Sequence, residues 1–369
     1  MNRRLLSLDV LRGADMLFIM GFGVLIRKIC TALGSGDCAF AQQFRHVVWD
    51  GLHFEDMIFP LFLFIAGVTF PYSSAKRIEN GASRASLVLG VLKRAAILFC
   101  LGLLYKGALK HGFADLGITS VLGRIGIAWA AAALVYLFVP LRKRIVLAVA
   151  TLIGYWLLLR FVGAPDHPDA FPLSPEGNLS GYFDRLLLPG RLTRPGVFAN
   201  EGTLSTVPAV VTAMLGMFVG EYMRQSSCSE SRKTVVLLLS SIVLTALGLG
   251  VAFGFGTYSM PLNKILWSSS FVLVVGGYSV ALFAIFHWLI DVKGLTGWTG
   301  FFRVIGVNSI TIYMAQAIVD FHGVSKFFFG GVSKLVPEAW APVVLQAGYV
   351  AACWCFLCFL DRRKIYLKV

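Results

Sequence analysis

Long apolar runs separated by short polar connections dominate the sequence. Each of ten runs is close to the length of about 20 mostly apolar residues that a helix needs to cross the hydrocarbon core of a bilayer. Their approximate bounds are 7–26, 54–72, 87–105, 118–139, 145–162, 204–223, 235–255, 265–290, 302–321 and 339–360. Backbone polar groups in lipid must be satisfied within the segment, and helices do this. The pattern therefore predicts an all-α integral membrane protein, a bundle of about ten transmembrane helices.

The composition excludes a water-soluble globule. Hydrophobic residues make up 57% of the 369 residues and charged residues only 14%, against roughly a quarter charged in an average soluble domain. We expect a single transmembrane domain over residues 1–369, with one long outer loop at about 163–203. The first run begins almost at Met1 and no small-residue cleavage site follows it, so we interpret it as a retained helix and not as a signal peptide.

The basic residues predict the orientation, because Lys and Arg near the ends of membrane spans tend to stay on the cytoplasmic side. With the N-terminus inside, the outer connections are less basic for their length, and the inner connections hold Arg3, Arg4, Lys76, Arg77, Arg84, Arg142, Lys143, Arg144, Arg224, Arg232, Lys233, Lys293, Arg362, Arg363, Lys364 and Lys368. We therefore expect both termini in the cytoplasm. The net charge of +14 is explained by this topology, and no nucleic-acid partner is expected.

Polar residues inside the predicted spans are the exceptions to the pattern. The first span carries Asp9, Arg12 and Asp15, which are three residues apart and so lie near one helical face. A structural ion pair is one interpretation, and a polar cavity is the other, because ionisable groups in membranes usually face a bundle interior. The cavity hypothesis is extended by Arg124, Asn263, Lys264, Asn308 and Gln316.

The cysteines indicate neither a zinc site nor a defined disulfide. No converging set of zinc ligands is visible, so no metal is expected. Cys353, Cys355 and Cys358 fall in one apolar run, where packing explains them. Cys30 and Cys38 would both face the outer side in this topology and are candidates for pairing.

The outer connection leading into the second span concentrates polar chemistry. Between Phe44 and Pro60 it places two histidines and three carboxylates at a membrane entrance: His46, His53, Asp50, Glu55 and Asp56. A histidine with a nearby acid is one way to build a general base that works near neutral pH. The alternative is that these histidines are merely solvated loop residues.

A set of short motifs recurs in order along most of the chain. They are SLDVLRG (7–13), HVVWDGL (46–52), DMIFPLFLFIAG (56–67), LGRIGIA (122–128), PEGNL (175–179) with YFDR (182–185), NEGTLST (200–206), PLNKILWS (261–268) and GVNSITIY (306–313). On these motifs the sequence resembles the transmembrane acetyltransferases typified by heparan-α-glucosaminide N-acetyltransferase, including their bacterial homologues. The C-terminal region beyond residue 313 matches only in hydropathy.

The resemblance implies transfer of an acetyl group from cytosolic acetyl-CoA, as co-substrate, to the amine of a glucosamine-containing sugar on the opposite side of the membrane. The active-site histidine of the family falls on His46, which an acid such as Asp50 or Asp56 would orient. Asn263 or Asn308 is a candidate donor to the developing oxyanion. O-acetylation of a cell-surface or periplasmic glycan, a glycan-precursor transporter and a structural membrane protein remain alternatives.

The matched motifs also supply candidate binding residues. Those for the CoA donor are Arg124, Arg12, Asn263, Lys264, Trp267, Ser268, Asn308 and Ser309, and those for the acceptor are Trp49, Glu201 and Asp9. The expected partners are the glycan acceptor and the lipid bilayer of a bacterial inner membrane, with a homodimer as a further hypothesis. The chain departs from the family pattern at Gly23, Asp50 and Gln316, where members often carry Asn, Asn and His. The identity of the acceptor therefore stays open.

Overall fold

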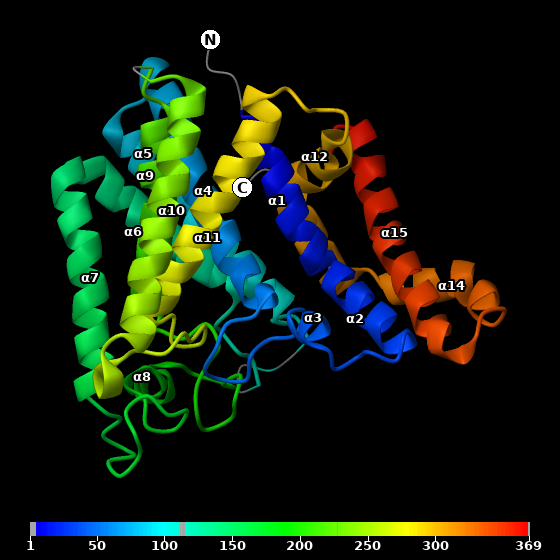
Figure 1. Cartoon of the computed structure of the whole chain (residues 1–369), viewed down its shortest axis with the longest axis horizontal. Helices are drawn as coiled ribbons and strands as arrows, with labels where there is room; N and C mark the ends of the chain where they lie inside the picture. The colour runs from blue at the N-terminus through cyan, green and yellow to red at the C-terminus, as the bar shows by residue number, and fades with distance from the viewer. Residues whose placement is uncertain (1–4, 111, 113–114, 227, 368–369) are drawn as a thin grey trace. The chain divides into compact units, whose positions relative to one another are not determined.

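A computed structural model of the chain describes residues 5–110, 112, 115–226 and 228–367 (Figure 1). Three of the basic residues used to predict the orientation, Arg3, Arg4 and Lys368, lie outside these residues. Within the described part of the chain the elements are helices, accompanied by two isolated β-bridges and no strand. The all-α prediction is therefore confirmed.

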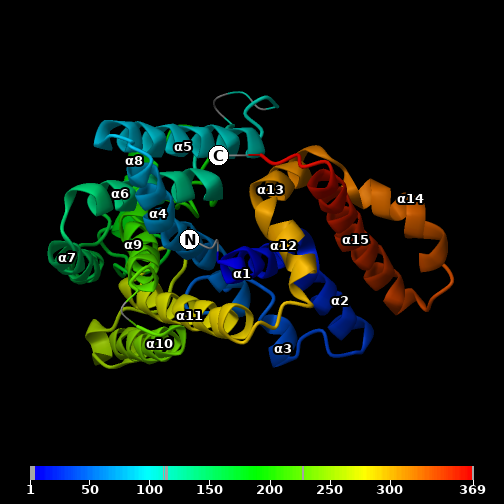
Figure 2. The same ribbon diagram turned by 90° about the horizontal axis from the view of Figure 1, so that it is seen from above.

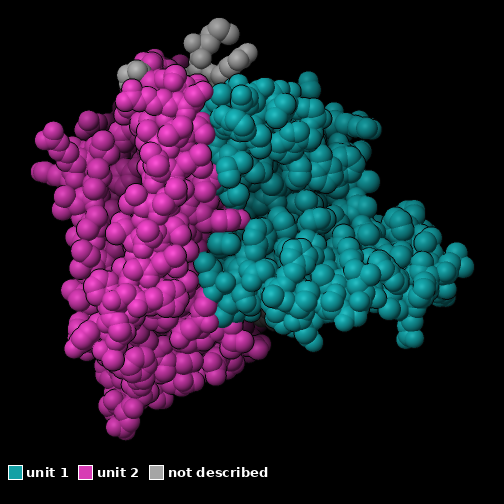
Figure 3. All heavy atoms as spheres, viewed as in Figure 1, with its two compact units in different colours: residues 1–47, 52–58, 282–368 teal, residues 48–51, 59–281, 369 magenta. Residues whose placement is uncertain are grey.

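The chain divides into two compact units, each described here by itself (Figure 3). Unit 1 comprises residues 1–47, 52–58 and 282–368, and unit 2 comprises residues 48–51, 59–281 and 369. The expectation of a single transmembrane domain stays a prediction.

Unit 1 is built from the two ends of the chain. Its helices are α1 (Leu6–Leu17), the π-helical turn η1 (Phe18–Phe22), α2 (Gly23–Ala32), α3 (Ala39–Gln42), η3 (Trp288–Val292), α12 (Thr299–Val307), α13 (Ser309–Ile318), α14 (Phe321–Ser333), η4 (Glu338–Trp340) and α15 (Ala341–Arg362). Helices α14 and α15 lie side by side in both ribbon views (Figures 1 and 2).

Unit 2 is built from the middle of the chain. Its helices are α5 (Arg84–Tyr105), α6 (Val121–Phe138), α7 (Leu141–Phe161), α8 (Leu179–Leu187), α9 (Thr206–Met223), α10 (Glu230–Phe253) and η2 (Gly256–Tyr258). The boundary between the units falls within α4 (Phe54–Glu79) and α11 (Ser269–His287).

Eight helices of the described residues are long and apolar enough to cross a membrane, and a bent pair raises the number to nine. The eight coincide with predicted spans two to eight and ten, with ends that differ by a few residues. The predicted count of about ten is thus approximate, and the two spans that differ are the first and the ninth.

Both exceptions are spans that bend. Between α1 and α2 the helix is interrupted at Gly21, whose φ of 92° is a left-handed conformation that glycine adopts without a side-chain clash. The ninth span is the pair α12 and α13, which meet at Asn308 with a bend of 67°. Apolar length alone predicts neither break.

Helix packing in unit 1 depends on two glycines that face each other across α1 and α12. A Cβ on Gly13 would lie 1.8 Å from the carbonyl oxygen of Phe302, and a Cβ on Gly306 would lie 1.9 Å from the carbonyl oxygen of Asp9. The two backbones are therefore in direct contact, as small residues permit in membrane helices. This explains the glycine that ends the first motif.

Unit 2 uses the same device between α4 and α9. A Cβ on Gly216 would lie 2.1 Å from the carbonyl oxygen of Phe64, and one on Gly67 would lie 2.2 Å from that of Ala213. Trp267, the largest fully buried side chain, packs edge-on against Phe59 and Phe271. Close packing of this kind is rigid, so it holds the backbone that carries the polar groups of unit 2 in place.

Candidate functional site

His46 and Asp56 form a histidine–carboxylate pair in unit 1. His46 Nδ1 lies 2.8 Å from Asp56 Oδ1, and the Asp56 side chain is 2% exposed whereas that of His46 is 60% exposed. Asp56 Oδ2 accepts hydrogen bonds from the backbone N–H groups of Val47 and His53, each at 3.2 Å. The buried carboxylate is thus fixed by the backbone, and it in turn orients the exposed imidazole.

The pairing decides the tautomer of His46. A carboxylate only accepts hydrogen bonds, so Nδ1 must carry the proton. Nε2 then carries the lone pair, which is the arrangement of a general base held by an acid. Of the two acids proposed from sequence, the structure places Asp56 against His46.

The second histidine of the segment is engaged differently. His53 Nδ1 lies 2.8 Å from the carbonyl oxygen of Arg45, and its backbone N–H supports Asp56. His53 therefore closes the loop around the carboxylate and is not paired with it through its ring.

Two of the three charged residues of α1 form the ion pair that is one interpretation of their spacing. Arg12 Nη1 lies 3.6 Å from Asp9 Oδ1, one helical turn away. Asp15 is buried, and its Oδ2 has no hydrogen-bond partner among the described residues. Asp9 and Arg12, proposed for the acceptor and donor, thus pair with each other.

Arg124 is the most unusual charge in unit 2. The residue is 3% exposed, and its Nη2 donates to the carbonyl oxygen of Gly202 at 3.2 Å and to Ser205 Oγ at 2.5 Å. Its guanidinium lies 5.1 Å from the ring centroid of Trp267. Within the described residues, Nε and Nη1 are buried and have no hydrogen-bond partner. The hydrogen-bond partners of this cation are neutral oxygens, whereas the carboxylates of Glu201 and Asp184 lie close enough to interact with it electrostatically. Two of its nitrogens keep capacity for a further anion or a carbonyl oxygen.

The segment that contacts Arg124 is held by a buried carboxylate. Asp184 Oδ1 accepts from the backbone N–H of Thr203 at 2.7 Å and from its hydroxyl at 3.1 Å, and Oδ2 accepts from the N–H of Ala199 at 3.1 Å. Burial raises the pKa of Asp184, and these hydrogen bonds oppose that shift. Asp184 therefore fixes the turn that carries Gly202 and Ser205.

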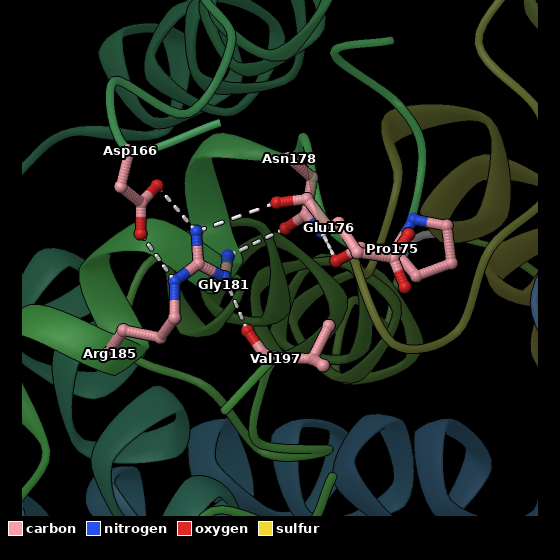
Figure 4. A network of polar contacts seen from close by, with 7 residues as sticks. All are labelled: Asp166, Pro175, Glu176, Asn178, Gly181, Arg185 and Val197. Atoms are coloured by element: carbon pink, nitrogen blue, oxygen red, sulfur yellow. Dashed lines mark hydrogen bonds and ion pairs between the residues drawn. The ribbon is translucent and has the colours of Figure 1, made fainter. Parts of the chain in front are cut away.

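A polar network holds the rest of the loop at 163–203 around α8 (Figure 4). Arg185 donates from Nε and Nη2 to Asp166 at 2.6 and 2.7 Å, and from Nη1 to the carbonyl oxygen of Val197 at 2.6 Å. Asn178 caps α8 by accepting from the N–H of Gly181 at 2.6 Å. The Arg185 guanidinium lowers the pKa of Asp166 through this bidentate contact. The loop predicted at 163–203 is thus an ordered element.

The loop before α11 is organised by Asn263 and Ser268. Asn263 accepts from the N–H of Leu266 at 2.8 Å, and its Nδ2 donates to Asp50 Oδ1 at 3.2 Å. Ser268 donates to the carbonyl oxygen of Pro261 at 2.8 Å and accepts from the N–H of Asn263 at 3.1 Å. Burial raises the pKa of Asp50, and the hydrogen bond from Asn263 opposes that shift. These side chains shape the loop through bonds within it and join it to Asp50 through Asn263.

The remaining candidates are distributed over both units. In unit 2, Trp49 donates to the carbonyl oxygen of Leu173 at 2.9 Å, Trp267 donates to Thr212 at 3.0 Å, and Lys264 is half-buried. Glu201 Oε2 is buried without a hydrogen-bond partner among the described residues. In unit 1, Asn308 and Ser309 are buried at the break between α12 and α13, where Asn308 Nδ2 donates to the carbonyl oxygen of Val304 at 3.2 Å.

Two polar residues of unit 2 were not selected from the sequence. Ser205 and Asp184 both lie inside matched motifs, but nothing in those motifs says that one contacts Arg124 and the other holds the contacting turn. A serine just before an apolar helical run is the only signal, and it predicts a helix start.

The structure bears on two further predictions, that no metal is bound and that Cys30 and Cys38 are candidates for a disulfide. Within the described ranges, no group of three or more His, Cys, Asp and Glu side chains is placed to hold a metal ion. Cys30 and Cys38 are both free thiols in the structure.

The fold and these polar clusters define a class: the protein is an all-α integral membrane protein with a histidine–carboxylate pair and a buried arginine. No protein-family model matches the chain. It is 28% identical to the heparan-alpha-glucosaminide N-acetyltransferase of Mus musculus over 88% of this chain and 56% of that protein. It is also 28% identical to the enzyme of the same name from Homo sapiens, over 99% of this chain and 60% of that protein. The chain thus spans less than two thirds of the length of these relatives. The resemblance indicated by the motifs is confirmed, and the chain is a distant relative of heparan-alpha-glucosaminide N-acetyltransferase.

Proposed function

We propose that the protein is a membrane-embedded acetyltransferase that moves an acetyl group from acetyl-CoA to the amine of a glucosamine-containing sugar. The observation that carries the proposal is the pairing of exposed His46 with buried Asp56 at 2.8 Å, in a chain related over nearly its whole length to N-acetyltransferases.

The chemistry requires a base, because an amino-sugar ammonium must lose a proton before its nitrogen can attack a thioester. In the proposed reaction His46 Nε2 accepts that proton, the amine nitrogen bonds to the acetyl carbon, and the carbon–sulfur bond breaks to release CoA as a thiolate, which then takes a proton. Asp56 holds the ring and stabilises the imidazolium that forms. An alternative order, in which Nε2 first accepts the acetyl group, uses the same pair.

Arg124 is the proposed donor-binding residue. Two of its nitrogens have no hydrogen-bond partner among the described residues and suit an anionic or carbonyl oxygen of the acetyl-CoA, and such a ligand offsets the cost of burying the charge. Arg124 lies in the first turn of α6, the end that the charge bias assigns to the outer side. There it would meet the acetyl and pantetheine end of the donor.

The test is a transfer assay with the purified full-length chain in detergent. Acetyl-CoA is offered with glucosamine, heparan fragments and neutral glycans, while free CoA and acetylated product are measured. We expect CoA release that depends on an amine acceptor. Release that occurs only with hydroxyl acceptors would establish the alternative, O-acetylation of a cell-surface or periplasmic glycan, and acceptor binding without any CoA release would favour a transporter.

The proposal includes an orientation in a bacterial inner membrane, with both termini cytoplasmic and His46 facing the opposite compartment. It is supported by the bias of basic residues. Single cysteines placed beside His46 and in the tail after Arg362 should react with impermeant reagents from opposite sides. Labelling of both from the same side would contradict the transfer of the acetyl group across the membrane.

A further inference from the structure

A cavity that takes no part in the proposed transfer lies entirely within unit 1. It has a volume of about 470 Å³ and is lined by residues of α2, α14, η4 and α15: Lys28, His322, Ser325, Lys326, Glu338, Ala341, Pro342, Leu345 and Gln346. This volume falls within the range of ligand pockets, roughly 300 to 1,000 Å³.

The polar lining of this cavity is mostly basic. Lys28, Lys326 and His322 face it with Glu338 as its one acidic side chain. Within the described residues, neither lysine forms an ion pair with a carboxylate. Lysines that line a cavity and form no ion pair with a carboxylate favour an anionic ligand.

Two of these side chains are positioned by their neighbours. Lys28 Nζ donates to Gln346 Oε1 at 3.0 Å, and Gln346 Nε2 donates to the carbonyl oxygen of Gly21 at 3.1 Å. An ammonium has three donors, so two of those of Lys28 remain for a ligand. The His322 ring stacks on Tyr349 with 4.3 Å between centroids. Lys28 and His322 are therefore held in place beside the cavity.

The other lining residues are apolar and belong to the beginning of a membrane span. Ala341, Pro342 and Leu345 lie in the first two turns of α15, within the candidate span Glu338–Arg362. The start of a span lies at the level of the lipid headgroups. The N-terminus of α15 also contributes a favourable field for an anion.

Helix α14 extends the apolar surface beside the cavity. It has 13 residues, too few to cross a membrane, yet Phe327, Phe328 and the following Leu335 are exposed. A short helix with exposed large apolar side chains lies readily in the membrane interface. A ligand with a negatively charged head and a hydrocarbon body matches both surfaces.

We propose that this cavity binds the phosphate headgroup of an anionic membrane phospholipid through Lys28 and Lys326, with the acyl chains along α14. The phosphate is proposed because its charge complements the two lysines. A lipid is proposed as its source because the adjoining helix α14 exposes apolar side chains.

The experiment compares lipid binding to the delipidated full-length protein by native mass spectrometry, with phosphatidylglycerol, phosphatidylcholine and inorganic phosphate as ligands. The test variant is Lys28→Gln with Lys326→Gln, and the matched control is Lys293→Gln with Lys334→Gln, two exposed lysines outside the cavity. The wild type should prefer phosphatidylglycerol. The test variant should lose that affinity by roughly tenfold or more, and the control should bind as the wild type does.

A second variant, Ala341→Trp, fills the cavity without changing its charge and should also reduce phosphatidylglycerol binding. If the double lysine variant does not fold, the Ala341→Trp variant alone tests whether the cavity binds the lipid. Equal binding of both phospholipids, or wild-type binding by the cavity variants, would overturn the proposal. Inorganic phosphate that displaces phosphatidylglycerol at similar concentration would show a site for soluble anions and would overturn the lipid assignment.

Discussion

The His46–Asp56 pair and the Arg124 cluster arrange a buried charge in opposite ways. Asp56 is buried and accepts hydrogen bonds from the His46 ring and from two backbone N–H groups, while the ring that it orients is largely exposed. Arg124 is buried too, yet it contacts neutral oxygens and two of its nitrogens have no partner among the described residues. A buried polar group without partners is costly. The first cluster is therefore complete as it stands, whereas the second gains from a bound ligand.

The largest expected effect comes from the exposed member of the first cluster. His46→Ala removes the proposed base, so the rate of acetyl transfer should fall by about 10² to 10⁴, while donor binding and thermal stability stay near wild type because the ring is 60% exposed. His53→Ala is the control, measured in the same transfer assay. Inactivation by His53→Ala with near-normal turnover of His46→Ala would refute the assignment.

The buried member of the pair should matter almost as much. Asp56→Asn replaces the carboxylate with an amide, which neither fixes the Nδ1–H tautomer nor stabilises the imidazolium, and turnover should fall by roughly 10² or more. Asp50→Asn is the matched change, since Asp50 bonds Asn263 and lies in the other unit, and family members often carry Asn there. Steady-state kinetics separate the two. An equal loss for both variants would show that Asp56 has no special role.

Arg124→Gln tests whether the second cluster binds the donor. The variant keeps a donor for Gly202 and Ser205 but loses the charge, so affinity for acetyl-CoA should fall by roughly ten- to a hundredfold. Isothermal titration with purified protein measures this, and Ser205→Ala is the control for simple loss of a contact. Unchanged donor affinity with weaker acceptor binding would reassign Arg124 to the acceptor.

The smallest effect is expected where a charge pair is exposed. The pKa of Asp166 is lowered by Arg185, so the stabilisation is present above the unfolded pKa of about 3.9 and is lost as the pH falls through the folded value. Asp166→Asn should thus lower the free energy of unfolding near pH 7 by at most about 1 kcal/mol, seen as a slightly lower thermal midpoint, and should have less effect near pH 3. A variant whose deficit grows as the pH falls would contradict this sign.

The sequence predicted the helices well because apolar length is a local property. Spans two to eight and ten coincide with observed helices. The break at Gly21 was not predicted, since a glycine inside an apolar run also fits a straight helix. The bend at Asn308 was missed because a single polar residue inside an apolar run also fits a straight helix.

The sequence predicted contacts in the site only between residues that lie close together along the chain. His46 and Asp56 lie in one short segment, so their proximity was expected, but the choice between Asp50 and Asp56 depended on the path of the loop. The partners of Arg124 lie about 80 residues further along the chain, and pairing over that distance is set by helix packing. No spacing pattern in a single sequence reveals it.

The contact between Gly13 and Gly306 joins segments that are synthesised far apart in time. Because a chain emerges from its N-terminus, α1 enters the membrane long before the ribosome has made α12. During that interval α1 has no α12 backbone to cover it, although it carries charged side chains. The contact of Arg12 with Asp9 within α1 is available from the start, and it shelters both charges until the last third of the chain arrives.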